Sequence, residues 1–453
     1  MVHLTVIGAS RNWMPSLGHD ILAVFPDPIE VRFADIEPKH AELCAAWGNA
    51  MSHAFGRHDR WLSVPDRREA LREADGVIIT ISTGGLEAMA CDIGIPEVYG
   101  IRATVGDTAG PGGWSRAIRN IPVFEAFAKD FREVCPRAFI ANYTNPMSAL
   151  TATLQLRCPN PVVGLCHSYF ETLDLIQGFF GLPDWSDIAV SLAGMNHFSW
   201  MTAFTVRGQD GYALMREKIS TGSLYDFLPE TLTDAHKHTS GVKLAAELYD
   251  RTGYLTYPAD RHICEFLSHT LYRPETGSME DEGEIWETIE PWGIRRTGMA
   301  TREKRMRQAD ARMTAEITGE KPAGPQRSRE TGIDMIRAYL ENKPMRDAVN
   351  MLNIGQIPGL PRGAAVETIG MVDGMGPRPM TVANVPEALL ELMRPQAVNQ
   401  AWLVEGMLER NPARLFDALH NDAQCAGMPQ SQVKEMGQRL IAANRGYVGL
   451  DWL

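Results

Sequence analysis

The first 193 residues alternate short apolar runs with segments of helical periodicity, and this alternation limits the fold more than any other feature of the chain. The apolar runs cover residues 2–7, 30–34, 76–81, 138–141, 162–165 and 188–193. Parallel strands need a long crossover between them, usually a helix, so the pattern is typical of a parallel sheet covered on both faces. We therefore predict an α/β fold with a Rossmann-like, doubly wound parallel sheet over residues 1–197. A mixed α+β, helix-rich domain is expected over residues 198–453.

The composition excludes several classes of partner. The net charge of −12 argues against nucleic acid or an anionic membrane as the main ligand. The chain has no run of about 18 apolar residues, so we expect no membrane-spanning segment. The seven cysteines are odd in number, scattered and free of CxxC spacing, which suits a reducing compartment. Since no signal peptide is visible either, we expect a cytoplasmic protein.

The first apolar run ends in Gly8-Ala9-Ser10 and precedes a helix candidate. This strand–turn–helix order is the opening of a dinucleotide-binding fold. The next run ends at Asp35, whose carboxylate can accept hydrogen bonds from both hydroxyls of an adenosine ribose and would repel a 2′-phosphate. The pattern therefore favours NAD over NADP. The usual fingerprint needs a second glycine near Ser10, which is missing, so an ordinary turn with a surface aspartate stays the alternative.

Polar side chains follow four other apolar runs: Thr83, Asn145, Cys166 and His197. Because the carboxyl ends of strands face the ligand crevice in such folds, we expect these side chains to lie along one edge of the sheet. A thiolate and an imidazole there could hold a transition-metal ion and leave open positions, as at catalytic metal sites. The alternative is a buried cysteine and a hydrogen-bonded histidine. Asn145 offers a donor and an acceptor to a hydroxyl, or it holds the bend before Pro146.

Two further segments carry charged side chains without a clear position. Residues 106–116 hold four glycines and a proline, so this segment must be a loop or the start of a helix. Its charged groups are Asp107 and Arg116, and a surface loop with a solvated ion pair is the alternative. Residues 254–265 combine phenols, acids and basic side chains, but composition alone does not place them in the crevice.

Taken in order, these motifs resemble family 4 of the glycoside hydrolases, the NAD- and metal-dependent glycosidases. The resemblance rests on Gly8, residues 106–113 with Arg116-Ala117, Thr144-Asn145-Pro146, Cys166-His167-Ser168, Asn196-His197, residues 353–361 and Val366-Glu367. The Cys-His-Ser and Gly-Asp-Thr motifs are most similar to the α-galactosidase branch, while the α-glucuronidase and α-galacturonidase branches also carry Cys-His. The first turn departs from the family pattern. Residues 254–265 match it loosely, and their cationic side chains favour an anionic sugar, such as a uronate or a sulfonated sugar (a sulfoquinovoside).

The resemblance implies a redox-assisted elimination. NAD⁺ takes a hydride from C3 of the sugar, a base removes the C2 proton, the glycosidic oxygen leaves, water adds and the hydride returns. The implied site consists of Cys166 and His197 as ligands of Mn²⁺ or another divalent transition metal, Gly8, Ser10, Asp35, Thr83 and Asn145 at the cofactor, and Asp107, Arg116, Asn145, Asn196 and His262 at the sugar. His167 would protonate the leaving oxygen. Asp260 is the first candidate for the C2 base, before Tyr254 and Tyr257.

An NAD-dependent dehydrogenase of a sugar or a 2-hydroxy acid is the main alternative on the same fold. Such an enzyme needs neither a cysteine ligand nor an elimination base, so Cys166 with His197 favours the glycosidase. A module that only senses NAD would need no metal ligands. The resemblance implies a small glycoside substrate and a homodimer or homotetramer. Under this hypothesis residues 1–197 bind NAD, and residues 198–453 bind the substrate and mediate oligomerisation.

Overall fold

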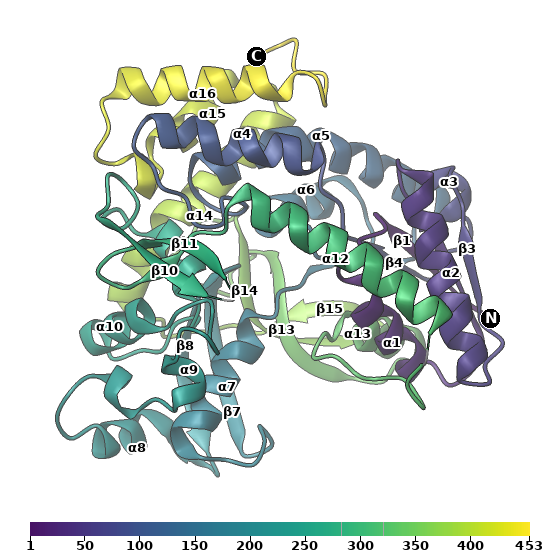
Figure 1. Ribbon diagram of the computed structural model, residues 1–453, viewed down its shortest axis with the longest axis horizontal. Coiled ribbons are helices and arrows are strands. Elements are labelled where there is room, and N and C mark those ends of the chain that lie inside the picture. Colours follow the sequence, from purple (N-terminus) through teal and green to yellow (C-terminus); the bar gives the residue numbers. More distant parts are fainter. Residues whose placement is uncertain (282, 320) are drawn as a thin grey trace.

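The computed structural model describes residues 1–281, 283–319 and 321–453, and one large sheet organises most of them (Figure 1). Its parallel half contains β1 (Val2–Ile7), β2 (Ile29–Ala34), β3 (Arg60–Ser63), β4 (Gly76–Ile79), β5 (Phe139–Asn142) and β6 (Val162–Gly164). The spatial order is β3-β2-β1-β4-β5-β6, and every neighbouring pair is parallel. This is the strand order of a dinucleotide-binding sheet, so the predicted Rossmann-like fold is confirmed.

The sheet continues beyond β6 as an antiparallel half. Its strands are β13 (Met345–Leu352), β14 (Ala365–Asp373), β7 (Ile188–Met195), β8 (Phe198–Val206) and β9 (Gln209–Asp210), with β15 (Gly376–Pro379) paired to β14. We expected the run at 188–193 to extend the parallel sheet. Instead, β7 pairs antiparallel with both β14 and β8. The reason is that β7 and β8 form a hairpin, and the place beside β6 is filled by β13 from the C-terminal half.

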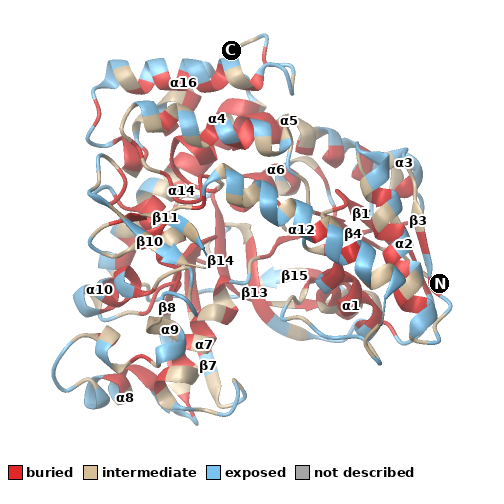
Figure 2. Cartoon of the chain, viewed as in Figure 1, coloured by how far each residue is buried: buried red, intermediate tan, exposed pale blue. Residues whose placement is uncertain are grey.

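Helices cover both faces of the parallel half, because successive side chains of a strand point in opposite directions. One face packs against α1 (Met14–Val24), α2 (Pro38–Ala54) and α13 (Gly332–Glu341), and the other against α5 (Gly110–Val134), α6 (Met147–Arg157), α15 (Pro412–His420) and α16 (Gln430–Asn444). In β4, Ile78 belongs to the first core, while Val77 and Ile79 belong to the second. Figure 2 shows the buried residues concentrated on the sheet and on the inner faces of these helices.

A third core lies around the antiparallel half. It includes side chains of α7 (Ser168–Phe180), α8 (Gly211–Lys218), η1 (Leu224–Phe227), α10 (Lys243–Thr252), α11 (Asp260–Ile263) and η2 (Cys264–Phe266), with α9 (Glu230–Thr233) beside them. The other helices are α3 (Arg67–Ala70), α4 (Gly85–Val98), α14 (Glu387–Leu408) and η3 (Ala423–Cys425). The boundary predicted at residue 197 falls in the turn between β7 and β8, and the functional division into two domains stays a prediction.

A small sheet and one long helix complete the fold near the crevice. The small sheet contains β10 (Thr276–Asp281), β11 (Glu284–Ile289) and β12 (Ile294–Arg295). From it, α12 (Met299–Thr318) runs across the molecule and packs against α2 (Figure 1). In the described part of the chain, no helix has both the length and the apolar content that crossing a membrane requires.

Candidate active site

The turn after β1 and the end of β2 lie together at the carboxyl edge of the parallel half. Gly8 has a φ of 90°, and a Cβ there would come 2.4 Å from the carbonyl oxygen of Thr80, so only glycine fits this turn. The Asp35 carboxylate accepts hydrogen bonds from the amides of Ala9 at 2.6 Å and Glu37 at 2.8 Å. A carboxylate has further lone pairs, so this arrangement fits the hydroxyls of a bound ribose.

Ser10 and Thr83, the next two predicted cofactor residues, have local partners. The Ser10 carbonyl accepts the amides of Trp13 at 3.0 Å and Met14 at 2.8 Å, which starts α1 beside the turn. The Thr83 hydroxyl donates to Asn120 Oδ1 at 2.7 Å and so points toward α5. The structure therefore places Ser10 at the cofactor turn and directs the Thr83 hydroxyl to α5, and the role of each toward a cofactor stays a prediction.

Three side chains from distant segments form a possible metal site. Asp107, His197 and His262 each offer one ligand atom, and these atoms all lie within 4.8 Å of one another. Asp107 precedes α5, His197 lies in the β7–β8 turn, and His262 is in α11. Carboxylate and imidazole ligands suit divalent ions such as Mn²⁺. We call these residues the three-residue group. It contains one predicted metal ligand, His197, and two residues predicted to contact the sugar.

Thr108 orients two members of this group. Its hydroxyl donates to Asp107 Oδ1 at 2.7 Å, and its oxygen lies 3.0 Å from Nδ1 of His197. With the hydroxyl proton given to Asp107, the Nδ1–H of His197 donates to Thr108, which leaves Nε2 with a lone pair. A second hydrogen bond of this kind commonly fixes the ring of a metal-binding histidine.

Both histidines of the group are buried and neutral, the form that binds metal. Burial lowers the pKa of His197 to about 4, although the charge of Asp107 opposes this change. Burial also lowers the pKa of His262 well below its ordinary value, and the charges of His197 and Arg261 add to the effect. The His262 Nδ1 atom is buried and has no hydrogen-bond partner among the described residues.

A chain of amide side chains connects the group to the strand ends. Asn145 Nδ2 donates to Asp107 Oδ2 at 3.3 Å, and Asn145 Oδ1 accepts from Asn196 Nδ2 at 3.0 Å. Arg116 Nε donates to the Asn145 carbonyl at 3.0 Å. The Asn196 Oδ1 atom is buried and, in the part of the chain that the structure describes, has no partner. The structure thus brings together Asp107, Arg116, Asn145 and Asn196, and it leaves an acceptor free for a sugar hydroxyl.

Cys166 follows β6 at the same sheet edge and is partly buried. The three-residue group, found among the described residues, does not include Cys166. Burial raises the pKa of its thiol well above the ordinary value, and the charge of Glu367 behind it adds to this shift. A neighbouring cation would be needed to hold the thiolate form. Its role as a metal ligand stays a prediction.

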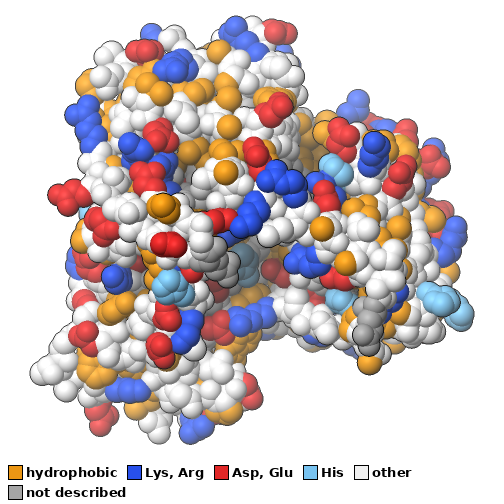
Figure 3. Space-filling model, in the orientation of Figure 1, with side chains coloured by type: hydrophobic (Ala, Val, Ile, Leu, Met, Phe, Trp, Pro, Cys, Tyr) orange, Lys and Arg blue, Asp and Glu red, His pale blue; other side chains and the backbone are white. Residues whose placement is uncertain are grey.

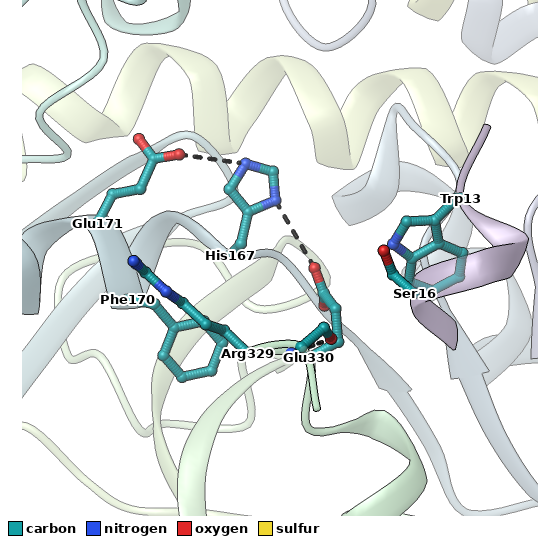
Figure 4. Close-up of a pocket in the computed structure, with 8 residues that line it drawn as sticks. Trp13, Ser16, His167, Phe170, Glu171, Arg329 and Glu330 are labelled. Carbon is teal, nitrogen blue, oxygen red and sulfur yellow. Dashed lines mark hydrogen bonds and ion pairs between the residues drawn. The ribbon is translucent and has the colours of Figure 1, made fainter. Parts of the chain in front are cut away.

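His167 caps α7 and lines a cavity of about 230 Å³ (Figure 4). Its Nε2 lies 3.4 Å from Glu171, and its Nδ1 lies 3.9 Å from Glu330. The side chain is 53% exposed, so it can exchange protons with water. In Figure 4, Trp13 lies across the cavity from His167. This position suits a general acid that meets a ligand in the cavity.

The structure places Asp260 and Tyr254 differently from the expectation of a C2 base. The Asp260 side chain is fully buried, and its carboxylate accepts the amides of Leu244 at 2.8 Å and Ala245 at 2.9 Å in the first turn of α10. It therefore anchors that helix, whose N-terminal dipole favours an acidic partner. Tyr254 packs edge-on against Tyr212, with ring centroids 5.4 Å apart, in the third core.

Tyr257, the remaining candidate for the base, lies against the three-residue group. Its ring is stacked 5.9 Å from that of His197 and 5.7 Å from that of His262. Burial raises the pKa of its phenol well above the ordinary value, and the charges of Glu171 and Cys166 add to this shift. Arg261 acts in the opposite direction. Of the three candidates, only Tyr257 contacts the group.

Glu265 is a site-forming residue that sequence reasoning missed. Its Oε1 accepts hydrogen bonds from three consecutive amides, those of Thr104 at 3.1 Å, Val105 at 2.8 Å and Gly106 at 2.8 Å. These bonds fix the backbone that leads into Asp107. A signal was present, because a carboxylate inside the apolar run 263–267 must find buried donors.

Comparison with known proteins gives consistent matches over nearly the whole chain. A family model described as "Family 4 glycosyl hydrolase" matches residues 4–181, and "Family 4 glycosyl hydrolase C-terminal domain" matches residues 192–425. An alpha-galacturonidase of Thermoanaerobacterium saccharolyticum is 30% identical over 92% of this chain and 90% of that protein. An alpha-galactosidase of Bacillus subtilis is 29% identical over 100% of this chain and 99% of that protein. A solved 6-phospho-alpha-glucosidase from gut microorganisms, in complex with NAD and Mn²⁺, superposes with a TM-score of 0.79 at 19% identity and covers 98% of both chains.

Replacing Glu265 by Gln tests the buried carboxylate through the pH dependence of stability. Burial, assisted by the charge of Asp107, raises the pKa of Glu265 to about 7, so stability that is present below pH 4.5 is lost as pH rises through 7. The Gln side chain cannot ionise. We therefore expect the free energy of unfolding of Glu265→Gln, relative to wild type, to rise by about 2.5 kcal/mol between pH 5 and pH 8 in urea titrations. Exposed Glu409→Gln is the control, and a constant difference for Glu265→Gln would contradict the raised pKa.

Proposed function

The chain belongs to the family 4 glycosyl hydrolases, and from this we propose that it hydrolyses an α-glycoside with bound NAD and a divalent ion such as Mn²⁺. The sugar is an α-galactoside or an anionic sugar. The observation that carries the proposal is the three-residue group at the carboxyl edge of a sheet with the dinucleotide-binding strand order. The NAD and Mn²⁺ of the related 6-phospho-alpha-glucosidase and the names of the two relatives support it.

The residues present fit both groups. Asp107, His197 and His262 would hold the ion, with neutral imidazoles and a carboxylate as ligands. Burial raises the pKa of Asp107, but its neighbours His197, Arg116, Arg302 and the hydroxyl of Thr108 lower it overall, so the carboxylate is ionised at neutral pH. The turn at Gly8 and the carboxylate of Asp35 would hold NAD. When bound, the pair supplies reversible hydride transfer at C3 and polarisation of the sugar oxygens.

The amide side chains of Asn145 and Asn196 position the sugar. Asn145 already shares hydrogen bonds with Asp107 and Asn196, and its side chain faces the three-residue group. The unpartnered Oδ1 of Asn196 can accept a hydrogen bond from a sugar hydroxyl. Arg116 keeps the Asn145 backbone in place through a hydrogen bond of 3.0 Å. These contacts would hold the ring of the sugar with C2 and C3 beside the group.

Two different side chains handle the two protons of the reaction. Tyr257 takes the C2 proton as its phenolate, because it is the candidate base that lies beside the three-residue group, where the charge of a bound divalent ion would favour that form. His167 gives a proton to the leaving oxygen and later takes one from the attacking water, because it lines a cavity and is half exposed. When water adds, Tyr257 returns its proton to C2. Protons and electrons therefore balance over one turnover, and the net reaction is hydrolysis.

The dehydrogenase of a sugar or a 2-hydroxy acid stays the competing function, since the Rossmann-like half also serves such enzymes. It would accumulate NADH, whereas the proposed cycle returns the hydride. We also keep as predictions the cytoplasmic location, the homodimer or homotetramer, and the absence of nucleic acid and membrane partners.

The first test is the release of p-nitrophenol from α-galactoside, α-glucoside, α-glucuronide and α-galacturonide substrates, with NAD⁺ and Mn²⁺ each present or omitted. We expect release to need both additives after bound cofactor is stripped, and absorbance at 340 nm to stay constant. Release without NAD⁺ would mean conventional hydrolysis. Net formation of NADH without release would favour the dehydrogenase.

The second test concerns the metal ligands. Replacing His262 by Ala or Asp107 by Asn removes one ligand, and we expect the dissociation constant for Mn²⁺ to rise by roughly 10- to 100-fold in calorimetric titrations. His238→Ala is a matched control, because among the described residues the His238 ring forms one hydrogen bond, to the Pro258 carbonyl at 3.0 Å. Unchanged Mn²⁺ affinity in both ligand variants would remove the group from the metal site.

The third test separates Tyr257 from Asp260. We expect Tyr257→Phe to lower kcat by about 10²- to 10⁴-fold and to stop deuterium incorporation at C2 of the product in D₂O, because the base is lost. Asp260→Asn weakens the anchor of α10 and should lower thermal stability, while deuterium incorporation per turnover continues. If Asp260→Asn abolishes the exchange and Tyr257→Phe preserves it, the assignment of the base is reversed.

A further inference from the structure

Three arginines from two separate elements converge near the candidate site. Arg261 belongs to α11 and directly precedes His262, a member of the three-residue group. Arg302 and Arg305 belong to α12, where a spacing of three residues places them on the same side of the helix. We call these three residues the arginine cluster.

The arginine cluster is bound to neutral atoms. Arg302 donates from Nε to the Thr297 carbonyl at 3.2 Å and from Nη2 to the Val105 carbonyl at 3.2 Å. Arg261 Nε lies 3.3 Å from Nε2 of His262. Within the described residues, no carboxylate lies within the 4.0 Å of an ion pair from any of the three guanidinium groups. By contrast, the fully buried Arg119 is paired with Asp92 at 2.6 Å.

The positions of these arginines point to the space beside the three-residue group. The Val105 carbonyl that holds Arg302 is two residues before Asp107. Burial lowers the pKa of Arg302 to about 10, Asp107 opposes this change, and Arg261 adds to it. Arg302 and Arg261 are therefore close enough to repel each other. Figure 3 shows a hollow between the part that carries β7 and β8 and the part that carries α1 and α2, with Lys and Arg side chains at its margin.

In the described part of the chain, carboxylates act on the arginine cluster only from beyond ion-pair distance: Asp107 and Glu265 act on Arg302, Glu284 on Arg305 and Glu171 on Arg261. Asp107 is committed to the three-residue group, and Glu171 lies beside His167. Glu284, the acid nearest to Arg305 along β11, pairs with Lys304. Half-buried guanidinium groups that repel each other are costly without a counter-ion, and an anion that accepts their N–H groups offsets this cost. A neutral sugar hydroxyl offers no charge to do so.

We propose that Arg261 and Arg302, with Arg305 at the rim, form a subsite for an oxyanion carried on the sugar. In a hexopyranose the only carbon outside the ring is C6, so the substrate would carry a carboxylate, a sulfonate or a phosphate there. This inference rests on the proposed function and decides between its two sugar classes in favour of the anionic one. Arg302 provides a guanidinium that two backbone carbonyls hold in place. Arg261 would bind the anion next to His262, and so place C2 and C3 of the sugar beside the three-residue group.

The test compares binding and turnover of matched sugars by the full-length enzyme with NAD⁺ and Mn²⁺. Calorimetry with galacturonate against galactose, and with sulfoquinovose and glucose 6-phosphate against glucose, measures the preference for an anion without requiring turnover. We expect wild type to bind at least one anionic sugar roughly 30-fold or more tightly than its neutral partner. The anion that binds most tightly identifies the source as a uronate, a sulfosugar or a phosphosugar.

Variants then assign the preference to the arginine cluster. Arg302→Gln and Arg261→Gln should each reduce the anion preference by roughly 30-fold or more, and should raise KM for the anionic p-nitrophenyl glycoside far more than KM for the neutral one. Arg302→Lys should keep part of the preference, because the charge remains but the fork geometry is lost. Arg307→Gln is the matched control, since Arg307 is 72% exposed on the same helix.

Equal binding of anionic and neutral sugars by wild type would overturn the inference, as would an anion preference that survives in Arg302→Gln and Arg261→Gln. Either result can be obtained while NAD⁺-dependent release of p-nitrophenol persists, so the proposed function would stand. Loss of NAD⁺-dependent release from every glycoside, with the anion preference in binding intact, would instead count against the proposed function alone.

Discussion

The arrangement of the site depends on the Glu265 carboxylate, which accepts hydrogen bonds from three consecutive backbone amides. Without it, buried N–H groups would lack acceptors, at a cost of about 1–3 kcal/mol each. The same bonds set the path of the chain into Asp107 and the first turn of α5. Asp107, the orienting hydroxyl of Thr108 and the buried guanidinium of Arg116 all follow from this path. One carboxylate outside the reacting centre therefore positions several groups inside it.

The two halves of the large sheet contribute different parts of the site. The parallel half brings Gly8, Asp35, Asn145 and Cys166 to one edge, because the carboxyl ends of parallel strands meet there. The antiparallel half brings His197, which adopts a φ of 65° in the turn between β7 and β8. β13 joins the halves by pairing with β6, so the turn at Gly8 and the turn that carries His197 belong to one continuous sheet. The relative positions of these groups are thus set by hydrogen-bonded strands.

Local charge in the crevice is opposite to the charge of the whole protein. The net charge is −12, yet arginines of α11 and α12 that have no ion pair among the described residues lie near the three-residue group. A negative net charge disfavours nucleic acid as a partner. The crevice can still attract a small anion at short range, since screening by salt limits the reach of surface charges to about 8 Å under physiological conditions. Under the proposal, the local positive charge of the crevice therefore acts on a small substrate and not on large partners.

The sequence by itself determined the Rossmann-like half, the turn that requires Gly8, the polar strand ends at Asn145 and Cys166, and the family, because strand periodicity, glycine turns and motif order are local properties of the chain. Sequence reasoning did not find the role of Glu265, the two arginines that α12 contributes to the arginine cluster, or the place of β13 beside β6. It also ranked Asp260 before Tyr257, although the Asp260 carboxylate binds the amides of α10 and Tyr257 stacks on His197. Only the tertiary structure shows these contacts, because a buried acid or base takes its partner from whichever distant segment packs against it, and no local pattern specifies that segment.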